Sequence, residues 1–338
     1  MTKTVLLTGV SGYIGLHVAK LLLEDGYHVR GSIRSKSKEK HVRDTLHAAS
    51  VDTSKLTFVE LDLSKDEGWD EAANGSDFVV HVASPFTVAN PKSEAEMINP
   101  AVEGTLRALH AAEKAKIKRV VLTSSLVSMM GSMKSGTVTP SHWTDINAKD
   151  VSTYIKSKTL AEKAAWDFVN SQASTNQMEL VVINPGAVYG PPLGDNLTGA
   201  SMGFIDQMLK GKLPMVPRLA MPMVDVRDVA KLHVLAMTHD GASGQRIIAS
   251  DSKPHGFADV AQVLKDEGYE GPSTRFAPNL IIRLSALFDR EAKGMLSFLG
   301  MNVSADNSRT QQLFDWTPIS FNKMIADTGA AVKAHQTS

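Results

Sequence analysis

A tyrosine and a lysine stand four residues apart in the segment YIKSK, which runs from Tyr154 to Lys158. In a helix, residues at this spacing lie on one face about a turn apart. A free tyrosine has a pKa of about 10, so it is a poor acid–base group at neutral pH unless a nearby ammonium stabilises the phenolate. Taken alone, Tyr154 would more often be a surface residue of a helix. The pair could also form a proton donor and the cation that tunes it.

A serine close to the tyrosine hydroxyl would complete a site that holds a carbonyl oxygen while this oxygen gains charge. The segment RVVLTSS offers Ser124 and Ser125 at the carboxyl end of an expected strand, where α/β sheets bind ligands. By themselves, the two serines would be better explained as the cap of a turn. Their occurrence in order with a glycine-rich loop, YIKSK and the segment NPG at residues 184–186 favours catalysis.

The first expected strand runs into TGVSGYIG, where Gly9, Gly12 and Gly15 form the pattern G-x-x-G-x-x-G before an expected helix. The first glycine permits a tight turn, the second lets the backbone approach a pyrophosphate, and the third lets helix and strand pack closely. The helix start also offers free N–H groups and a partial positive charge to phosphates. We therefore expect dinucleotide contacts at Gly9, Ser11, Gly12, Tyr13, Ile14 and Gly15.

The second expected strand favours the phosphorylated form of the cofactor. It reads HVRGSIRSKSKEK, so Arg34 and then Lys36, Lys38 and Lys40 follow Ile33. NAD-binding sheets usually place an acid here for the ribose 2′-hydroxyl, and an acid would repel a 2′-phosphate. An arginine fork would clasp it. A solvated basic face is disfavoured because cations are unfavourable at a helix start. We expect NADP(H) with Arg34 as the main ligand, and which lysine assists stays open.

Short apolar runs alternate with segments of helical periodicity, which is typical of a parallel sheet with helices on both faces. The expected strands are Thr4–Thr8, His28–Ile33, Thr57–Glu60, Phe78–Val82, Arg119–Thr123 and Glu179–Ile183. The expected helices are Tyr13–Asp25, Lys38–Ala49, Ser93–Lys116, Ser152–Ser171, Met202–Lys210 and the segment VDVRDVAKLHVLAM. The prediction is an α/β fold with a Rossmann-type doubly wound sheet. Residues 1–185 form an NADP(H)-binding domain, residues 186–338 form mainly a smaller substrate-binding lobe, and the chain returns to the sheet near residues 223–250.

Composition excludes several other classes of protein. The 338 residues include no cysteine, which rules out thiolate catalysis, disulfides and cysteine-ligated metals. The formal net charge is zero, so no nucleic-acid partner is expected. No histidine–carboxylate cluster has metal-ligand spacing, so no metal is expected. The chain shows neither a secretory leader nor an apolar run of about 20 residues, so we expect a cytoplasmic protein without membrane partners.

Six motifs together resemble those of the extended short-chain dehydrogenase/reductase family. They are TGVSGYIG, LDL at 61–63, HVASP at 81–85, VVLTSS at 120–125, YIKSK at 154–158 and NPGAVYGP at 184–191. HVASPF, RVVLTSS, Tyr154–Trp166 and Val224–His233 are closer to the dihydroflavonol 4-reductase-like branch. This branch includes cinnamoyl-CoA reductases and methylglyoxal and carbonyl reductases. The resemblance covers residues 1–250 well and the remainder loosely.

The resemblance implies a role for each matching residue. Ser125 would hold the carbonyl oxygen, with Ser124 as the fallback, while Tyr154 would be the acid–base residue and Lys158 its partner. The further cofactor contacts that it implies are Asp62 and Leu63 at the adenine, Ala83 and Ser84 near the middle, Thr123, Tyr154 and Lys158, Pro185, Gly186 and Val188 at the nicotinamide, and Ser201 at the phosphates. Many members dimerise through the helices expected at Ser93–Lys116 and Ser152–Ser171, and others are monomers, so a monomer or homodimer is expected.

The expected function is NADPH-dependent reduction of an aldehyde or ketone to the alcohol. Phe86, Met129, Tyr189 and Met221 are the expected substrate wall, and their apolar character suits an aromatic or medium-chain carbonyl compound. A sugar-nucleotide epimerase or dehydratase is disfavoured by Arg34 and by the lack of an acidic pair after the strand-end threonine. A steroid-type alcohol dehydrogenase stays open. A non-catalytic NADP(H)-binding redox sensor is disfavoured because the tyrosine and the lysine are both present.

Overall fold

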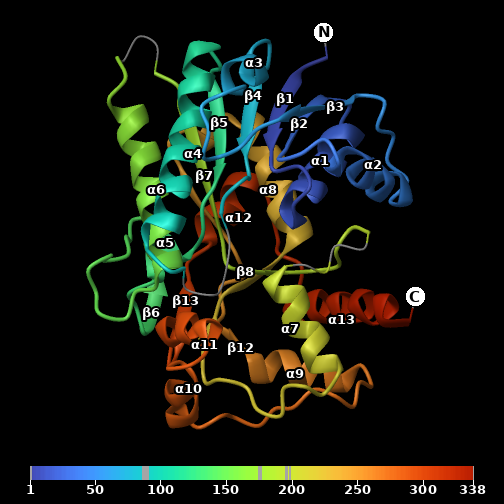
Figure 1. The fold of residues 1–338 in the computed structure, drawn as a ribbon, viewed down its shortest axis with the longest axis vertical. Coiled ribbons are helices and arrows are strands. Elements are labelled where there is room, and N and C mark those ends of the chain that lie inside the picture. The colour runs from blue at the N-terminus through green and yellow to red at the C-terminus, as the bar shows by residue number, and fades with distance from the viewer. Residues whose placement is uncertain (1, 86–90, 174–176, 195–196, 198, 338) are drawn as a thin grey trace.

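The centre of the molecule is a parallel sheet between two layers of helices (Figure 1). The structure is a computed structural model that describes residues 2–85, 91–173, 177–194, 197 and 199–337. Within these residues, seven strands pair in the order β11-β7-β5-β4-β1-β2-β3, and every pairing is parallel. The strands are β1 (Thr4–Thr8), β2 (His28–Ile33), β3 (Leu56–Glu60), β4 (Phe78–His81), β5 (Arg119–Thr123), β7 (Glu179–Pro185) and β11 (Arg246–Ala249). The predicted fold class is confirmed.

Each face of the sheet is covered by its own helices because successive side chains of a strand point to opposite faces. On β1, Val5 and Leu7 join one hydrophobic cluster, and Leu6 joins the other. The first cluster is closed by α1 (Tyr13–Glu24), α2 (Lys38–Ala48) and α8 (Val226–Thr238). The second is closed by α3 (Trp69–Ala73), α4 (Ala95–Lys114) and α6 (Thr153–Asn170). Figure 1 shows these two groups on opposite sides of the sheet.

A second lobe lies beyond the carboxyl ends of the strands (Figure 1). Its described strands form a parallel pair and a four-stranded sheet in the order β12-β9-β13-β6. They are β8 (Ala187–Tyr189), β10 (Met223–Asp225), β6 (Ser135–Val138), β9 (Ala220–Met221), β12 (His255–Gly256) and β13 (Asn302–Ala305). The remaining helices are α5 (Val127–Met130), α7 (Ala200–Leu209), α9 (Phe257–Asp266), α10 (Asn279–Ser285), α11 (Arg290–Met295), α12 (Ser308–Phe314) and α13 (Phe321–Thr337).

The two lobes are interleaved in sequence. β6 lies within the first 185 residues, yet it pairs with β13 in the sheet of the second lobe. In the opposite direction, α8 packs on α1, and β11 extends the central sheet beside β7. The sequence predicted a return of the chain to the sheet in this region, but β11 was not among the predicted strands. In the described part of the chain, no helix has the length and apolar character needed to cross a membrane.

Candidate active site

A cavity of about 720 Å³ runs along the carboxyl edge of the central sheet and is closed by the second lobe. Parallel strands end at one edge, so the loops that follow them meet there although they are far apart in sequence. The predicted cofactor and catalytic residues that line the cavity are Gly9, Ser11, Gly12, Tyr13, Ile14, Gly15, Arg34, Leu63, Ala83, Ser84, Thr123, Ser125, Tyr154, Lys158, Pro185, Gly186, Val188 and Ser201. Asp62 lies outside the lining, and its carboxylate accepts hydrogen bonds from the backbone and hydroxyl of Ser64.

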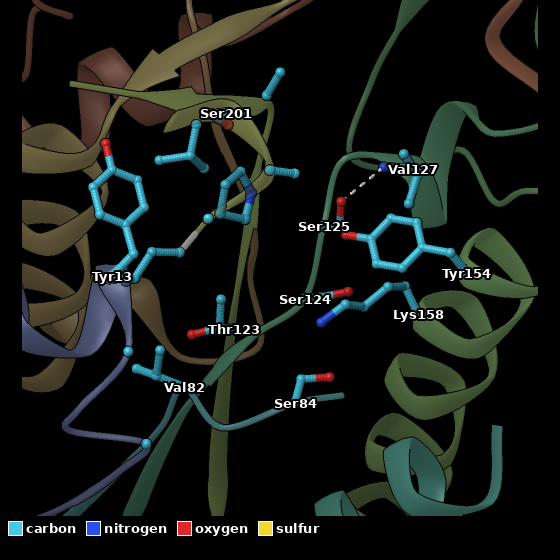
Figure 2. A pocket seen from close by; sticks show the side chains of 18 of the residues that line it. Tyr13, Val82, Ser84, Thr123, Ser124, Ser125, Val127, Tyr154, Lys158 and Ser201 are labelled. Carbon is cyan, nitrogen blue, oxygen red and sulfur yellow. Dashed lines mark hydrogen bonds between the residues drawn. The ribbon is translucent and has the colours of Figure 1, made fainter. Parts of the chain in front are cut away.

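Ser125, Tyr154 and Lys158 meet on one wall of this cavity. Figure 2 shows the Ser125 and Tyr154 hydroxyls facing each other, with Lys158 beside them. The hydroxyls are hydrogen-bonded to each other. Helix α6 carries the tyrosine and the lysine, and Lys158 Nζ lies 6.0 Å from the centre of the Tyr154 ring. Ser125 lies two residues after the end of β5, so a strand and a helix set the geometry.

Burial changes the acid–base properties of both titratable groups. It raises the pKa of Tyr154, while the hydrogen bond with Ser125 acts in the opposite direction. Burial also lowers the pKa of Lys158 to about 8, because the residue is only 7% exposed and the protein interior disfavours the charged form. At neutral pH the tyrosine therefore carries its proton and most of the lysine carries its charge. At neutral pH the site therefore places a protonated tyrosine, which can donate its proton, beside a positively charged lysine.

The two adjacent serines point to different partners. Ser124 is 6% exposed, and its hydroxyl donates to Glu162 Oε2 at 2.5 Å in the interior. Ser125 is the serine whose hydroxyl meets Tyr154. This geometry favours Ser125 over the fallback Ser124 as the group that contacts a carbonyl oxygen. Glu162 was not singled out from the sequence, although it continues the four-residue spacing of Tyr154 and Lys158 along α6.

Thr123 presents a hydrogen-bond acceptor to the cavity. Its Oγ1 lies 2.6 Å from His233 Nε2, and His233 Nδ1 lies 2.7 Å from the carbonyl oxygen of Val229. A carbonyl only accepts, so Nδ1 must carry the proton. Burial lowers the pKa of His233 to about 4, so the ring is neutral and Nε2 accepts the hydroxyl proton of Thr123. The oxygen of Thr123 therefore has only lone pairs left for a ligand.

The glycine-rich loop has the shape of a phosphate cradle. Gly9 has φ +71°, and a Cβ on it would lie 3.0 Å from Ala83 Cα. A Cβ on Gly15 would lie 2.1 Å from the carbonyl oxygen of Gly9. Gly12 is the N-cap of α1 and has no side chain that could cap the first turn. Side chains would fill this space, so the loop and the helix start fit the pyrophosphate of a dinucleotide.

The cavity wall formed by the second lobe and by α5 is apolar. Its side chains are Leu126, Val127, Met130, Leu219, Met221, Phe257, Met295 and Phe298. Met221 was among the predicted wall residues. Met129 and Tyr189 were also predicted there, but they are 1% and 3% exposed and pack in hydrophobic clusters outside the lining. Phe86 lies outside the described residues.

Both misplaced residues are next to a residue that does line the cavity. On β8, Val188 lines the cavity, so its successor Tyr189 must point to the opposite face and into the lobe core. In α5, Met129 and Met130 both pack in a cluster with Val138 and Met301, but only Met130 also lines the cavity, because the side chain of Met129 is rotated from it by about 100° around the helix. The sequence showed the segments that build the wall, but the direction of each side chain depends on how the lobe docks.

Comparisons with known proteins identify the family. The sequence matches the model of the NAD dependent epimerase/dehydratase family over residues 5–249. The chain belongs to this family, the extended short-chain dehydrogenases/reductases. It is 30% identical to a putative NADPH-dependent methylglyoxal reductase of Candida albicans, and the alignment covers 98% of each chain. It is 37% identical to cinnamoyl-CoA reductase 2 of Arabidopsis thaliana over 78% of this chain and 76% of the relative.

A solved structure extends this likeness to the whole chain. Yeast methylglyoxal/isovaleraldehyde reductase Gre2, complexed with NADPH, superposes with a TM-score of 0.81 and 25% identity over 99% of each chain. The predicted family and the dihydroflavonol 4-reductase-like branch are therefore confirmed. The match includes the part of this extended short-chain dehydrogenase/reductase after residue 250, where the sequence motifs gave only a loose resemblance.

Proposed function

We propose that this protein reduces an aldehyde or a ketone to the alcohol with NADPH. The observation that carries the proposal is the meeting of the Ser125 and Tyr154 hydroxyls beside Lys158, at the apolar end of the cavity. Two hydroxyl donors that converge at one point suit a carbonyl oxygen that gains negative charge. Relatives named as NADPH-dependent methylglyoxal reductases, and the NADPH complex of a related structure, support the choice of reaction and cofactor.

The residues at the other end of the cavity fit NADPH. The loop from Gly9 to Gly15 would hold the pyrophosphate, and Arg34 would clasp the 2′-phosphate. Lys38 lines the cavity together with Arg34. Lys40 instead pairs with Asp44 at 2.5 Å, and its side chain is 86% exposed. Lys38 is therefore the lysine that we expect to assist Arg34. Thr123 would accept a hydrogen bond from a donor group of the cofactor.

When bound, NADPH supplies the hydride that the carbonyl carbon receives. The Ser125 and Tyr154 hydroxyls donate hydrogen bonds to the carbonyl oxygen and stabilise its developing charge. Tyr154 then transfers its proton to that oxygen, which completes the alcohol. The Lys158 ammonium stabilises the phenolate that remains on Tyr154. Hydride and proton together account for the two hydrogens that the carbonyl group gains.

The lining of the cavity also favours a class of substrate. Among the described lining residues, the charged side chains are Arg34, Lys38 and Lys158, and none of them belongs to the wall formed by the second lobe. The methionine and phenylalanine side chains of that wall suit an aromatic or medium-chain carbonyl compound. A sugar nucleotide would bring phosphates to a wall without cations. An apolar secondary alcohol of steroid type would fit the same wall, and its oxidation is the reverse reaction.

The test is the consumption of NADPH with aldehydes, α-dicarbonyls, ketoesters and aryl ketones, with NADH and the Tyr154→Phe variant beside it. We expect turnover with NADPH that is lost in the variant. Turnover by the variant at the wild-type rate would contradict the role of Tyr154. If the protein binds NADPH and reduces none of these compounds, the proposal is wrong. Sugar nucleotides and steroid-type alcohols with NADP⁺ would then be tested, and inactivity on these as well would favour the redox sensor.

A further inference from the structure

Glu162 is a buried carboxylate that lies close to the cavity wall where Ser125, Tyr154 and Lys158 meet. It has no role in the proton and hydride transfer described above. Its side chain is 0% exposed, and its Oε1 forms an ion pair with Arg246 Nε at 2.5 Å. Its Oε2 accepts hydrogen bonds from the hydroxyls of Ser124 and Ser128, each at 2.5 Å, and from Asn184 Nδ2 at 2.7 Å. A buried charge is tolerated only when it is paired and hydrogen-bonded, and here both conditions are met.

The donors to Glu162 surround Ser125 on the chain and in space. Ser124 precedes it, and Ser128 follows it by three residues in the first turn of α5. Ser128 Oγ also lies 2.8 Å from the backbone oxygen of Ser125, so its single proton is shared between this oxygen and the carboxylate. Asn184 Nδ2 donates to the same backbone oxygen at 3.3 Å. The carboxylate therefore fixes the backbone on both sides of Ser125. It also holds the Ser124 hydroxyl in the interior, away from the place where the Ser125 and Tyr154 hydroxyls meet.

Arg246 holds the carboxylate in place from the other side. It is the first residue of β11, and its Nη1 donates to the carbonyl oxygens of Pro140 and His142 at 2.8 and 2.6 Å. Its guanidinium also lies 3.7 Å from the centre of the Trp143 ring. Because Arg246 is fixed by an edge strand and a loop, Glu162 has little freedom to move. A continuous set of contacts thus runs from β11 to the backbone of Ser125.

We propose that Glu162 is a positioning residue that orients the Ser125 hydroxyl toward Tyr154 without touching the reacting atoms. Five named groups carry this proposal: Arg246, Ser124, Ser128, Asn184 and the Ser125 backbone oxygen. For its activity readout, the proposal rests on the proposed carbonyl reduction. Its distinguishing feature is that Glu162 acts through Ser125, so the effect of losing Glu162 depends on whether Ser125 has its hydroxyl.

The test is a double-mutant cycle of Glu162→Gln and Ser125→Ala. A glutamine has the shape of the carboxylate but lacks the charge, and its NH₂ group cannot accept the hydrogen bonds that it would face. We expect Glu162→Gln to lower kcat by roughly 10- to 100-fold, with the KM for NADPH within about threefold of wild type. In the Ser125→Ala background the same change should lower kcat by less than about threefold. Independent losses that multiply would overturn the proposal.

Glu179→Gln is the matched control for a purely structural effect. Glu179 pairs with Arg119 at the amino ends of β5 and β7, far from the carboxyl edge that carries Ser125, and neither residue lines the cavity. We expect Glu179→Gln to lower the melting temperature while leaving kcat within about twofold. If Glu179→Gln lowers kcat as much as Glu162→Gln does, the effect of Glu162 is general destabilisation and the proposal is wrong.

Two further experiments keep the proposal testable if Glu162→Gln fails to fold or if the wild type reduces no carbonyl compound. Ser128→Ala leaves the ion pair in place and removes one link between Glu162 and Ser125. It should lower kcat by roughly three- to tenfold, and this loss should vanish in the Ser125→Ala background. Without any turnover, a crystal structure of Glu162→Gln or Ser128→Ala gives the answer. A Ser125 hydroxyl that still meets Tyr154 would overturn the positioning role but not the proposed function.

Discussion

Two ion pairs of similar chemistry lie near opposite ends of the neighbouring strands β5 and β7. At the amino ends of β5 and β7, Arg119 Nε donates to Glu179 Oε2 at 2.6 Å, and Arg119 Nη1 donates to carbonyl oxygens at the end of α8. Near the carboxyl ends of these strands, Arg246 at the start of β11 pairs with Glu162 of α6 and likewise donates to backbone carbonyl oxygens. In both places a largely buried arginine joins a carboxylate to backbone carbonyl oxygens of another segment of the chain.

The difference lies in what surrounds each carboxylate. The side chain of Glu179 is 21% exposed and also pairs with Lys118. The side chain of Glu162 is 0% exposed, and its donors flank Ser125. Loops that carry ligand contacts leave a parallel sheet at its carboxyl edge. The same kind of ion pair therefore supports the fold at one end and the candidate active site at the other, and the following predictions test this division.

The largest effect is expected at the carboxyl end, from loss of the proton donor. Tyr154→Phe should lower kcat by about 10³-fold, because it removes both the proton and one hydrogen bond to the carbonyl oxygen. NADPH binding, measured by fluorescence titration, and the melting temperature should stay close to wild type. A variant that keeps more than a tenth of the activity would contradict the assignment of Tyr154.

At the amino ends of β5 and β7, we expect a substitution to lower stability and leave activity unchanged. Arg119→Met should lower the free energy of unfolding by about 3 kcal/mol, because it leaves Glu179 without its main partner. The kcat of the folded variant should be unchanged. Urea denaturation gives the stability, and the NADPH assay at low temperature gives kcat. A fall of more than tenfold in kcat for fully folded protein would contradict the view that the Arg119–Glu179 pair supports only the fold.

Cofactor choice at the end of β2 should depend on Arg34. Arg34→Ser should lower kcat/KM for NADPH by roughly 10- to 100-fold and leave NADH almost unaffected, because the lost hydrogen bonds go to a charged phosphate. Lys38→Ala should give a smaller loss of the same kind. Lys40→Ala is the control, since Lys40 pairs with Asp44 outside the cavity. Equal losses with both cofactors would contradict the 2′-phosphate role.

The pH profile should reveal the charge of Lys158. Burial lowers its pKa to about 8, so the cationic form predominates below pH 8 and is lost above it. We expect kcat/KM for carbonyl reduction to fall above about pH 8, by up to about tenfold per pH unit. Glu179→Gln should leave this profile unchanged. A profile that stays flat to pH 9.5 would show that the lysine charge is not needed in this range.

The smallest effect is expected for the acceptor at the end of β5. Thr123→Val has the shape of threonine but offers no lone pair to a ligand, so it should weaken NADPH binding by about fivefold. Thr123→Ser keeps the hydroxyl and should bind almost as tightly as wild type. Isothermal titration calorimetry measures both. Equal weakening by valine and serine would show that the methyl group, and not the acceptor, is what matters.

The parts of the molecule that could be predicted are those in which local pattern and structure coincide. The six predicted strands are present, and their bounds shift by no more than two residues. Buried parallel strands are continuous apolar runs, and this pattern is visible without any knowledge of their neighbours. β11 has only four residues, Arg246–Ala249, and it begins with the arginine that forms the ion pair with Glu162. So short a strand, with a charged first residue, is hard to recognise from sequence.

The sequence by itself determined the glycine-rich loop, Arg34 and the spacing of Tyr154 and Lys158, because each depends on backbone geometry within a few residues or on the charge of one side chain. The family resemblance already favoured Ser125 over Ser124. The tertiary structure alone showed that Ser124 turns inward to Glu162, that Lys38 lines the cavity together with Arg34, and that Met130 rather than Met129 lines it. Glu162 belongs to this second group. Its partners Ser124, Ser128, Asn184 and Arg246 come from the end of β5 and from α5, β7 and β11, and only the packing of these elements places the four polar groups around one buried carboxylate.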